Sequence, residues 1–153
     1  MFNPILEASL LAWFIAQLLK ILITAIQDKK FDFVKFWSSG GMPSSHSSTV
    51  CALATACAYV YGHVSPYFAI SAILAVVVMY DAAGVRRAVG EQAKVLNFIN
   101  ATSVEDGEPG IMQKALKELI GHTPLQVVFG ALLGILMGIF YPMLCGIPSF
   151  YAA

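Results

Sequence analysis

Two short polar segments, each at the start of an apolar stretch, carry residue types that could do chemistry. The first is Gly40-Gly41-Met42-Pro43-Ser44-Ser45-His46-Ser47-Ser48. Glycines allow close backbone approach to a ligand, and proline and serine are typical of a helix's first turn and cap. A helix N-terminus binds anions such as phosphate, and a histidine exchanges protons near neutral pH. The segment predicts either a phosphate cradle with an acid–base group or an ordinary capped helix with an interfacial histidine.

The second segment is Gly121-His122-Thr123-Pro124-Leu125-Gln126, which again places a proline in the first turn of an apolar helix. Residues four apart share a helix face, so Gln126 can lie beside His122 and accept a hydrogen bond from one ring nitrogen. That bond would fix the tautomer and leave the other nitrogen as a nucleophile. Taken alone, the pair favours the simpler interpretation, a capped helix with two polar residues at an interface.

Basic side chains complete the pattern. Lys20 lies within an apolar stretch, where it could neutralise a phosphate or extend its ammonium group to the membrane surface. Arg86 and Arg87 are adjacent and point about 100° apart on a helix. One of them could grip a phosphate with its planar fork while the other meets lipid head groups, or both could anchor the inner leaflet.

The elements that must position these residues are membrane helices. The chain is 58% hydrophobic and only 12% charged, about half the charged fraction usual in soluble domains. Its net charge of zero argues against a nucleic-acid partner. The three cysteines fall in apolar segments without the spacing of a metal site, so no metal or cofactor is expected. Four segments are long enough to cross a bilayer, which needs about 20 residues; they cover 5–26, 43–61, 65–83 and 124–144.

We therefore predict an all-α, polytopic membrane helical bundle, one domain over residues 1–153, with about four transmembrane helices. A helix could continue over 85–100, and a short amphipathic helix is expected over 111–120. All nine Lys and Arg lie in or after the first segment and after the third. The positive-inside rule makes those two loops cytoplasmic and puts both termini outside. The membrane would be a bacterial inner membrane or a derived organelle membrane.

This topology brings the chemically interesting residues to one depth near the cytoplasmic face. Ionisable groups in or near a membrane are costly and mark functional sites. The convergence therefore favours a functional site over two separate capped helices. The residues that converge are Lys20, His46, Arg86, Arg87 and His122.

The motifs described above together resemble those of the small, divergent branch of the superfamily of type-2 phosphatidic acid phosphatases and vanadium haloperoxidases. Pro43-Ser44-Ser45-His46 is similar to the Pro-Ser-Gly-His signature of that superfamily. The resemblance covers nearly the whole chain, and its motifs agree in order and spacing. The other matching strings are Ala12–Lys20, Tyr80–Ala93 and Gly121–Pro124.

The resemblance implies a metal-independent phosphatase that acts on a lipid phosphate or diphosphate. His122 would be the nucleophile that forms a phosphohistidine, and His46 would protonate the leaving group. Gln126 would orient His122. The implied phosphate-binding residues are Lys20, Gly41, Ser44, Ser45 and one of Arg86 or Arg87.

Four departures from the superfamily pattern bear on activity. No Arg-Pro follows Lys20 at the spacing of the superfamily, and no Ser-Arg pair precedes His122 at the expected distance. Ser45 stands in place of a glycine, and Gln126 stands in place of an acidic residue. A neutral amide can orient an imidazole but cannot stabilise the imidazolium by charge, and losing such a carboxylate can cost up to about 10⁴ in rate. A lipid-phosphate binding or transport protein without turnover is therefore the alternative, and an assembly factor for a membrane complex is a third reading. Membrane lipids are the expected surroundings, and four short crossings would suit a homodimer.

Overall fold

The computed structural model describes residues 3–28, 41–105, 116 and 123–152, with backbone alone at 27–28, 85–87, 103–105 and 152. Within those ranges the chain is helical and forms no strand, so the prediction of an all-α bundle is confirmed. The elements are α1 (Pro4–Asp28), α2 (Ser45–Tyr61), α3 (Pro66–Ala83), α4 (Val85–Glu105), α5 (Pro124–Leu144) and the short η2 (Phe150–Ala152).

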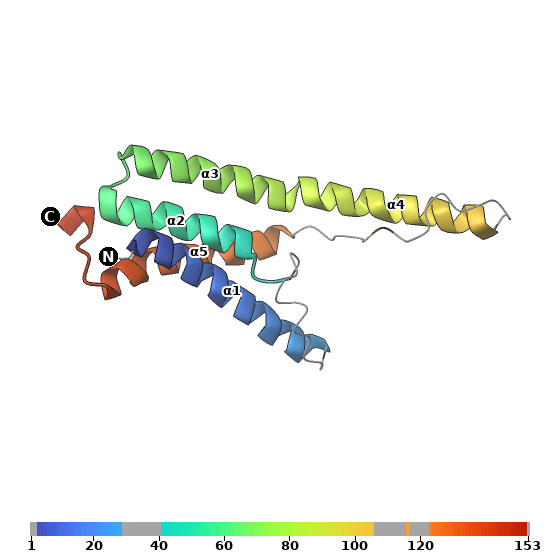
Figure 1. The fold of residues 1–153 in the computed structure, drawn as a ribbon, viewed down its shortest axis with the longest axis horizontal. Helices are drawn as coiled ribbons and strands as arrows, with labels where there is room; N and C mark the ends of the chain where they lie inside the picture. The colour runs from blue at the N-terminus through green and yellow to red at the C-terminus, as the bar shows by residue number, and fades with distance from the viewer. Residues whose placement is uncertain (1–2, 29–40, 106–115, 117–122, 153) are drawn as a thin grey trace.

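Three stretches of helix are long and apolar enough to cross a membrane, namely Pro4–Ile26, Pro66–Thr102 and Pro124–Leu144. The remaining helix of the bundle, α2, has 17 residues and is about 25 Å long. It lies at the centre and packs against α1, α3 and α5. The start of α1 and the C-terminal η2 lie at the same end of the bundle (Figure 1), and α1, α2, α3 and α5 follow one another along it. A membrane crossing by α2 stays a prediction. The side of the membrane on which the termini lie stays a prediction.

The predicted continuation beyond α3 is present as α4, which runs in line with α3 and extends past the other helices (Figure 1). Helical hydrogen bonds continue across the junction, from Gly84 N to Tyr80 O (2.9 Å) and from Ala88 N to Gly84 O (3.1 Å). The predicted amphipathic helix over 111–120 lies outside the described residues except for Leu116. The side-chain amide of Asn97 pairs with the backbone N and O of Leu116, at 2.8 and 2.9 Å.

A stripe of glycines closes the contact between α2 and α5. Gly130, Gly134 and Gly138 recur every four residues on one face of α5 and are buried. A Cβ placed on Gly130 would lie 2.3 Å from the carbonyl oxygen of Ser44, and one on Gly134 would lie 2.3 Å from that of Ser48. Membrane helices without a hydrophobic driving force associate through such small residues, which let two backbones touch.

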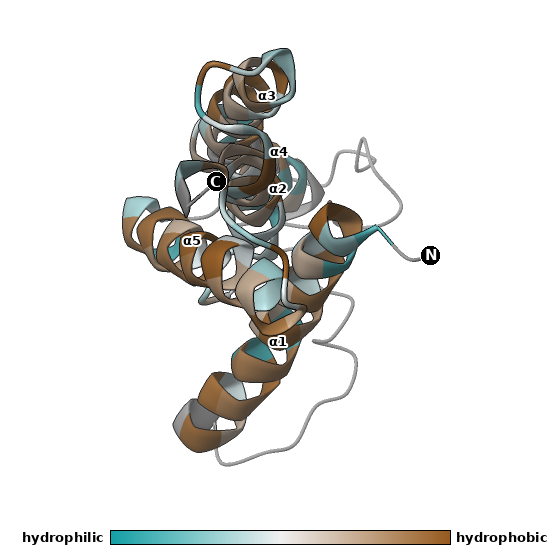
Figure 2. Ribbon diagram, turned by 90° about the vertical axis from the view of Figure 1, so that its left-hand side faces the viewer, coloured by the Kyte–Doolittle hydropathy of each residue, from teal (hydrophilic) through white to brown (hydrophobic). Residues whose placement is uncertain are grey.

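Helix α1 also packs against α2 through a row of small residues. Ala8, Ala12 and Ala16 also recur every four residues and are fully buried. The hydroxyl of Ser48 donates to the carbonyl oxygen of Ala12 at 3.0 Å, which fixes the register of α1 against α2. The helices of the bundle are predominantly apolar (Figure 2), and many of their large apolar side chains are exposed, as expected where lipid surrounds a protein.

Candidate functional site at the start of helix α2

The segment 41–48 forms a tight turn that ends in a capped helix. Ser44 is the N-cap of α2 and is fully buried. Its Oγ accepts hydrogen bonds from Ser47 N (3.4 Å) and Ser47 Oγ (3.1 Å). Gly41 has φ +98°, a conformation that residues with side chains rarely adopt. Both features were expected from the residue types, but the burial of Ser47 and Ser48 was not, and it makes the first turn of α2 a polar core element.

Lys20 lies beneath this turn. It is only 1% exposed, and its Nζ donates to Gln17 Oε1 at 2.7 Å. A Cβ added to Gly41 would lie 3.0 Å from the Cγ atom and 3.2 Å from the Cδ atom of Lys20. The glycine is therefore needed twice, once for its backbone angle and once for close approach to the lysine stem. Gln17, one turn before the lysine, was not among the predicted site residues.

The N-terminus of α5 meets the N-terminus of α2 at the same place. The backbone N–H of Ser44 donates to the carbonyl oxygen of Gln126 at 3.0 Å. Thr123 caps α5, and it forms a capping box in which Gln126 Oε1 accepts from Thr123 N at 3.1 Å. Gln126 thus has a structural role that the sequence analysis did not assign to it. An amide has further lone pairs and donors, so this role is compatible with the predicted one toward His122.

The arrangement concentrates positive potential. Each helix N-terminus carries the equivalent of about half a positive charge, because its first N–H groups lack partners within the helix. Two such ends, α2 and α5, are joined by a hydrogen bond, and the stem of the Lys20 side chain lies against Gly41, three residues before the cap of α2. In surroundings of low dielectric, charges act on one another more strongly than in water. An anion with several oxygen acceptors is the ligand that this geometry suits.

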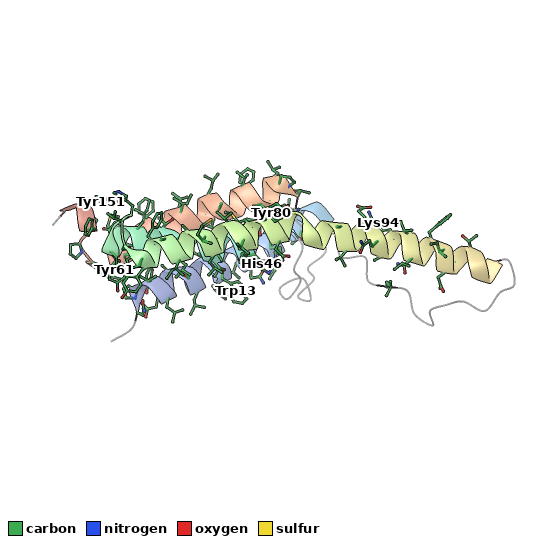
Figure 3. The ribbon with its side chains drawn as sticks, turned by 90° about the horizontal axis from the view of Figure 1, so that it is seen from above. Trp13, His46, Tyr61, Tyr80, Lys94 and Tyr151 are labelled. Atoms are coloured by element: carbon green, nitrogen blue, oxygen red, sulfur yellow. The ribbon has the colours of Figure 1, made fainter. Side chains whose placement is uncertain are left out.

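His46 lies in the first turn of α2 and is half-buried, with its Nδ1 atom buried. The preceding residue, Ser45, is buried. Figure 3 shows His46 and Trp13 of the adjacent α1 on the same side of the bundle. The bond between Ser48 and Ala12 puts these two residues within about one helical turn in height. An acid–base group is thus placed next to the electropositive end of α2.

The described structure brings together six of the predicted site residues at one end of the bundle. They are Lys20, Gly41, Ser44, Ser45, His46 and Gln126. His122, directly before the cap of α5, lies outside the described residues. Arg86 and Arg87 belong to the first turn of α4, and their side chains are also outside the description. In the part of the chain that is described, no three His, Cys, Asp or Glu side chains group as metal ligands would.

Comparison with known proteins agrees with this picture. The model of the divergent PAP2 family matches residues 1–137. An uncharacterized membrane protein of Bacillus subtilis (strain 168), YuiD, is 47% identical over 141 residues, which cover 86% of this chain and 89% of the relative. No solved structure matches. Since the family match covers the chain from α1 to α4, with the polar turn at the start of α2, and most of α5, the chain is a membrane protein that belongs to the divergent PAP2 family.

Proposed function

We propose that this protein is a phosphatase that releases phosphate from a lipid phosphate or diphosphate at the cytoplasmic face of a membrane. The observation that carries the proposal is Lys20, buried beneath Gly41 where the N-termini of α2 and α5 meet. A phosphate group suits this place, because its oxygens can accept from the ammonium group of Lys20, in addition to the bond that this group makes to Gln17, and from the N–H groups of a helix end.

The reaction needs two histidines. A ring nitrogen of His122 attacks phosphorus, the bond from phosphorus to the lipid oxygen breaks, and the His46 imidazolium gives its proton to that oxygen, so a lipid alcohol leaves. Water then attacks phosphorus, the bond from phosphorus to nitrogen breaks, and His46 accepts the proton from water. The products are the alcohol and inorganic phosphate. With a lipid diphosphate, the bond that breaks is the one from the terminal phosphorus to the bridging oxygen, so the lipid monophosphate leaves in place of the alcohol. The enzyme returns to its first state. Lys20 offsets the charge of the phosphoryl oxygens.

The test is phosphate release by the detergent-purified protein from a panel of phosphatidic acid, phosphatidylglycerol phosphate and undecaprenyl phosphates. We expect His122→Ala to abolish release and His46→Ala to reduce it by about 10²–10⁴, the usual contribution of acid–base catalysis. His63→Ala is the matched control, because His63 is exposed in the turn between α2 and α3, far from the site. Release that survives in His122→Ala would refute the proposed mechanism.

A single-turnover experiment addresses the intermediate directly. With a lipid carrying labelled phosphate, the wild-type protein should retain an acid-labile, base-stable label, as a phosphohistidine does. The label should be absent from His122→Ala and present in His46→Ala wherever the first step still occurs. Label that stays on His122→Ala would assign the nucleophile to another residue.

One observation favours a second function, binding or transport of a lipid phosphate without turnover. Gln126 is neutral, and its side-chain oxygen takes part in the capping box of α5. In that case the wild-type protein binds lipid phosphates and releases no phosphate. Gln126→Glu would then gain release, because a carboxylate both orients His122 and stabilises its imidazolium form.

A further inference from the structure

The side chain of Lys20 turns away from the nearer end of α1. A lysine toward the end of a membrane helix usually extends its ammonium group to the water at that end. For Lys20 that direction is toward Asp28, the last residue of α1. Its Nζ atom instead donates to Oε1 of Gln17 at 2.7 Å, one turn in the opposite direction, and Lys20 is only 1% exposed. The ammonium group is therefore held inside the bundle.

Gln17 is itself a buried polar residue in an apolar helix. It is 5% exposed, and apart from Lys20 the other buried residues of α1 are apolar or carry a single hydroxyl group. A buried amide costs free energy unless it is hydrogen-bonded, and an apolar side chain would suit a membrane helix better. The bond to Lys20 is therefore where we look for the role of this amide.

The register between α1 and α2 sets the depth of Gln17 in the bundle. The two helices run in opposite directions (Figure 1), and the bond from Ser48 Oγ to Ala12 O aligns them. Gln17 lies about 8 Å beyond Ala12 along α1, and the cap Ser44 lies about 6 Å from Ser48 in the same direction along α2. The bond to Gln17 thus brings the ammonium group to about the depth of the first turn of α2, where the helix presents its N–H groups.

The type of acceptor at position 17 matters for an anion. An ammonium group has three N–H donors, and the bond to Gln17 uses one of them. A neutral amide fixes the direction of the group without adding negative charge. A carboxylate at the same place would form an ion pair with the ammonium group and would repel a phosphate. A glutamine is thus the acceptor suited to holding a cation that binds an anion.

We propose that Gln17 is a positioning residue, which orients the ammonium group of Lys20 toward a phosphate group bound at the start of α2. The inference rests on the proposed function for the presence of that phosphate, and it adds the residue that aims the cation. Gln17 acts through Lys20 and takes no part in bond breaking. The group recognised is the phosphate, whether it belongs to a lipid or is free in solution.

The test measures phosphate binding, which needs no turnover. Equilibrium dialysis of the detergent-solubilised full chain with labelled inorganic phosphate gives one dissociation constant, and phosphatidic acid in mixed micelles gives another. Gln17→Met keeps the length of the side chain without its acceptor and should weaken both at least about tenfold, the value of a hydrogen bond to a charged group. Wild-type affinity in this variant, or a loss with phosphatidic acid alone, would overturn the inference.

Gln17→Glu separates positioning from a purely structural role. A carboxylate accepts from Lys20 at least as well as an amide does. If Gln17 only satisfied a buried lysine, Gln17→Glu would bind phosphate like the wild type, and that result would overturn the inference. Positioning instead predicts that Gln17→Glu binds both probes more weakly than Gln17→Met, with thermal stability unchanged or higher. Where Gln17→Met does not fold, Gln17→Glu decides alone.

Ser9→Ala is the matched control. Ser9 is also a buried polar residue of α1, and its hydroxyl donates to Ile5 O at 2.8 Å, near the other end of the helix. Both dissociation constants should stay at their wild-type values in this variant. Equal weakening in Ser9→Ala and the Gln17 variants would show a general effect of the helix and would overturn the inference.

The outcomes separate this inference from the proposed phosphatase. If the wild-type protein binds phosphate, the two Gln17 variants lose that binding and no lipid is hydrolysed, the phosphatase alone is rejected. If the wild-type protein releases phosphate and both Gln17 variants do so with the same KM, the positioning role alone is rejected. A wild-type protein that binds neither probe would also reject the positioning role.

Discussion

Gly134 provides the sharpest test of how the bundle is held together. A Cβ at this position would lie 2.3 Å from the carbonyl oxygen of Ser48, 2.8 Å from Cys51 Cβ and 2.9 Å from Ala52 N. Two of the three atoms are backbone atoms, which no side-chain rotation can move aside. A carbon–oxygen contact needs about 3.3 Å. In Gly134→Ala the two helices must therefore separate by about 1 Å along the whole seam.

The loss of stability expected from an added methyl group differs among the glycines. Overpacking by one methyl group costs about 1–3 kcal/mol, and Gly134→Ala should be at the upper end. Gly138→Ala should cost less, because its closest contacts are 2.7 Å, to Ala52 O and to the Thr55 Cβ atom. Gly146→Ala is the control. It has no atom within 4 Å and only the strain of φ +72°, about 1 kcal/mol.

The assay is the thermal or denaturant-induced unfolding of the purified proteins in one detergent. We expect stability to decrease in the order wild type, Gly146→Ala, Gly138→Ala, Gly134→Ala. The separation should also stretch the bond from Ser44 N to Gln126 O, which lies at the site end of the same seam, so lipid-phosphate binding should weaken as well. If Gly134→Ala were as stable as Gly146→Ala, the direct backbone contact between α2 and α5 would be wrong.

Three further predictions concern polar groups inside or beside the bundle. Lys20→Met removes a buried charge but keeps an apolar side chain of similar length, so thermal stability should stay the same or rise. Phosphate release should fall at least about tenfold. Full activity in this variant would exclude Lys20 as a phosphate ligand. Tyr141→Phe loses the hydrogen bond from the phenol to Glu7 Oε2 (2.7 Å) that joins α5 to α1, so unfolding measurements should show a lower stability. Glu7→Gln keeps an acceptor and should lose less. Tyr151→Phe removes the hydroxyl that contacts His63 N (3.2 Å) and the His63 ring. Proteolysis after residue 145 should therefore become faster, while phosphate release stays unchanged. An unchanged cleavage rate would show that this contact does not hold the C-terminal segment.

Much of the fold could be predicted because its causes are local. Segments predicted at 43–61, 65–83 and 124–144 agree with α2, α3 and α5 to within two residues. An apolar run of about 20 residues satisfies its own backbone only as a helix in a membrane. The caps Ser44 and Thr123 act on N–H groups three residues away, so the ends of these helices can be recognised without knowing what they touch.

The candidate site was predictable in its residue types and less so in its construction. The sequence leaves Lys20 open as a snorkelling or a phosphate-binding residue, and it does not predict the burial of Lys20 against Gly41. Phosphate binding by Lys20 stays a prediction. Gln126 was assigned to His122 alone, whereas the structure also gives it a capping bond and a backbone bond to Ser44. The contacts of Lys20 with Gly41 and of Ser44 with Gln126 join residues more than twenty and more than eighty positions apart, and no local pattern encodes them.

The sequence by itself determined that this is an all-α membrane protein whose polar motifs begin two of its helices, because hydrophobic length and capping chemistry depend on near neighbours only. The tertiary structure decided which faces meet. The repeat of Gly130, Gly134 and Gly138 is visible in the sequence, yet only packing shows that it lies against α2 and brings the two backbones into contact. The physical reason is that helix association in a membrane depends on the fit between two distant surfaces, and a single segment contains only one of them.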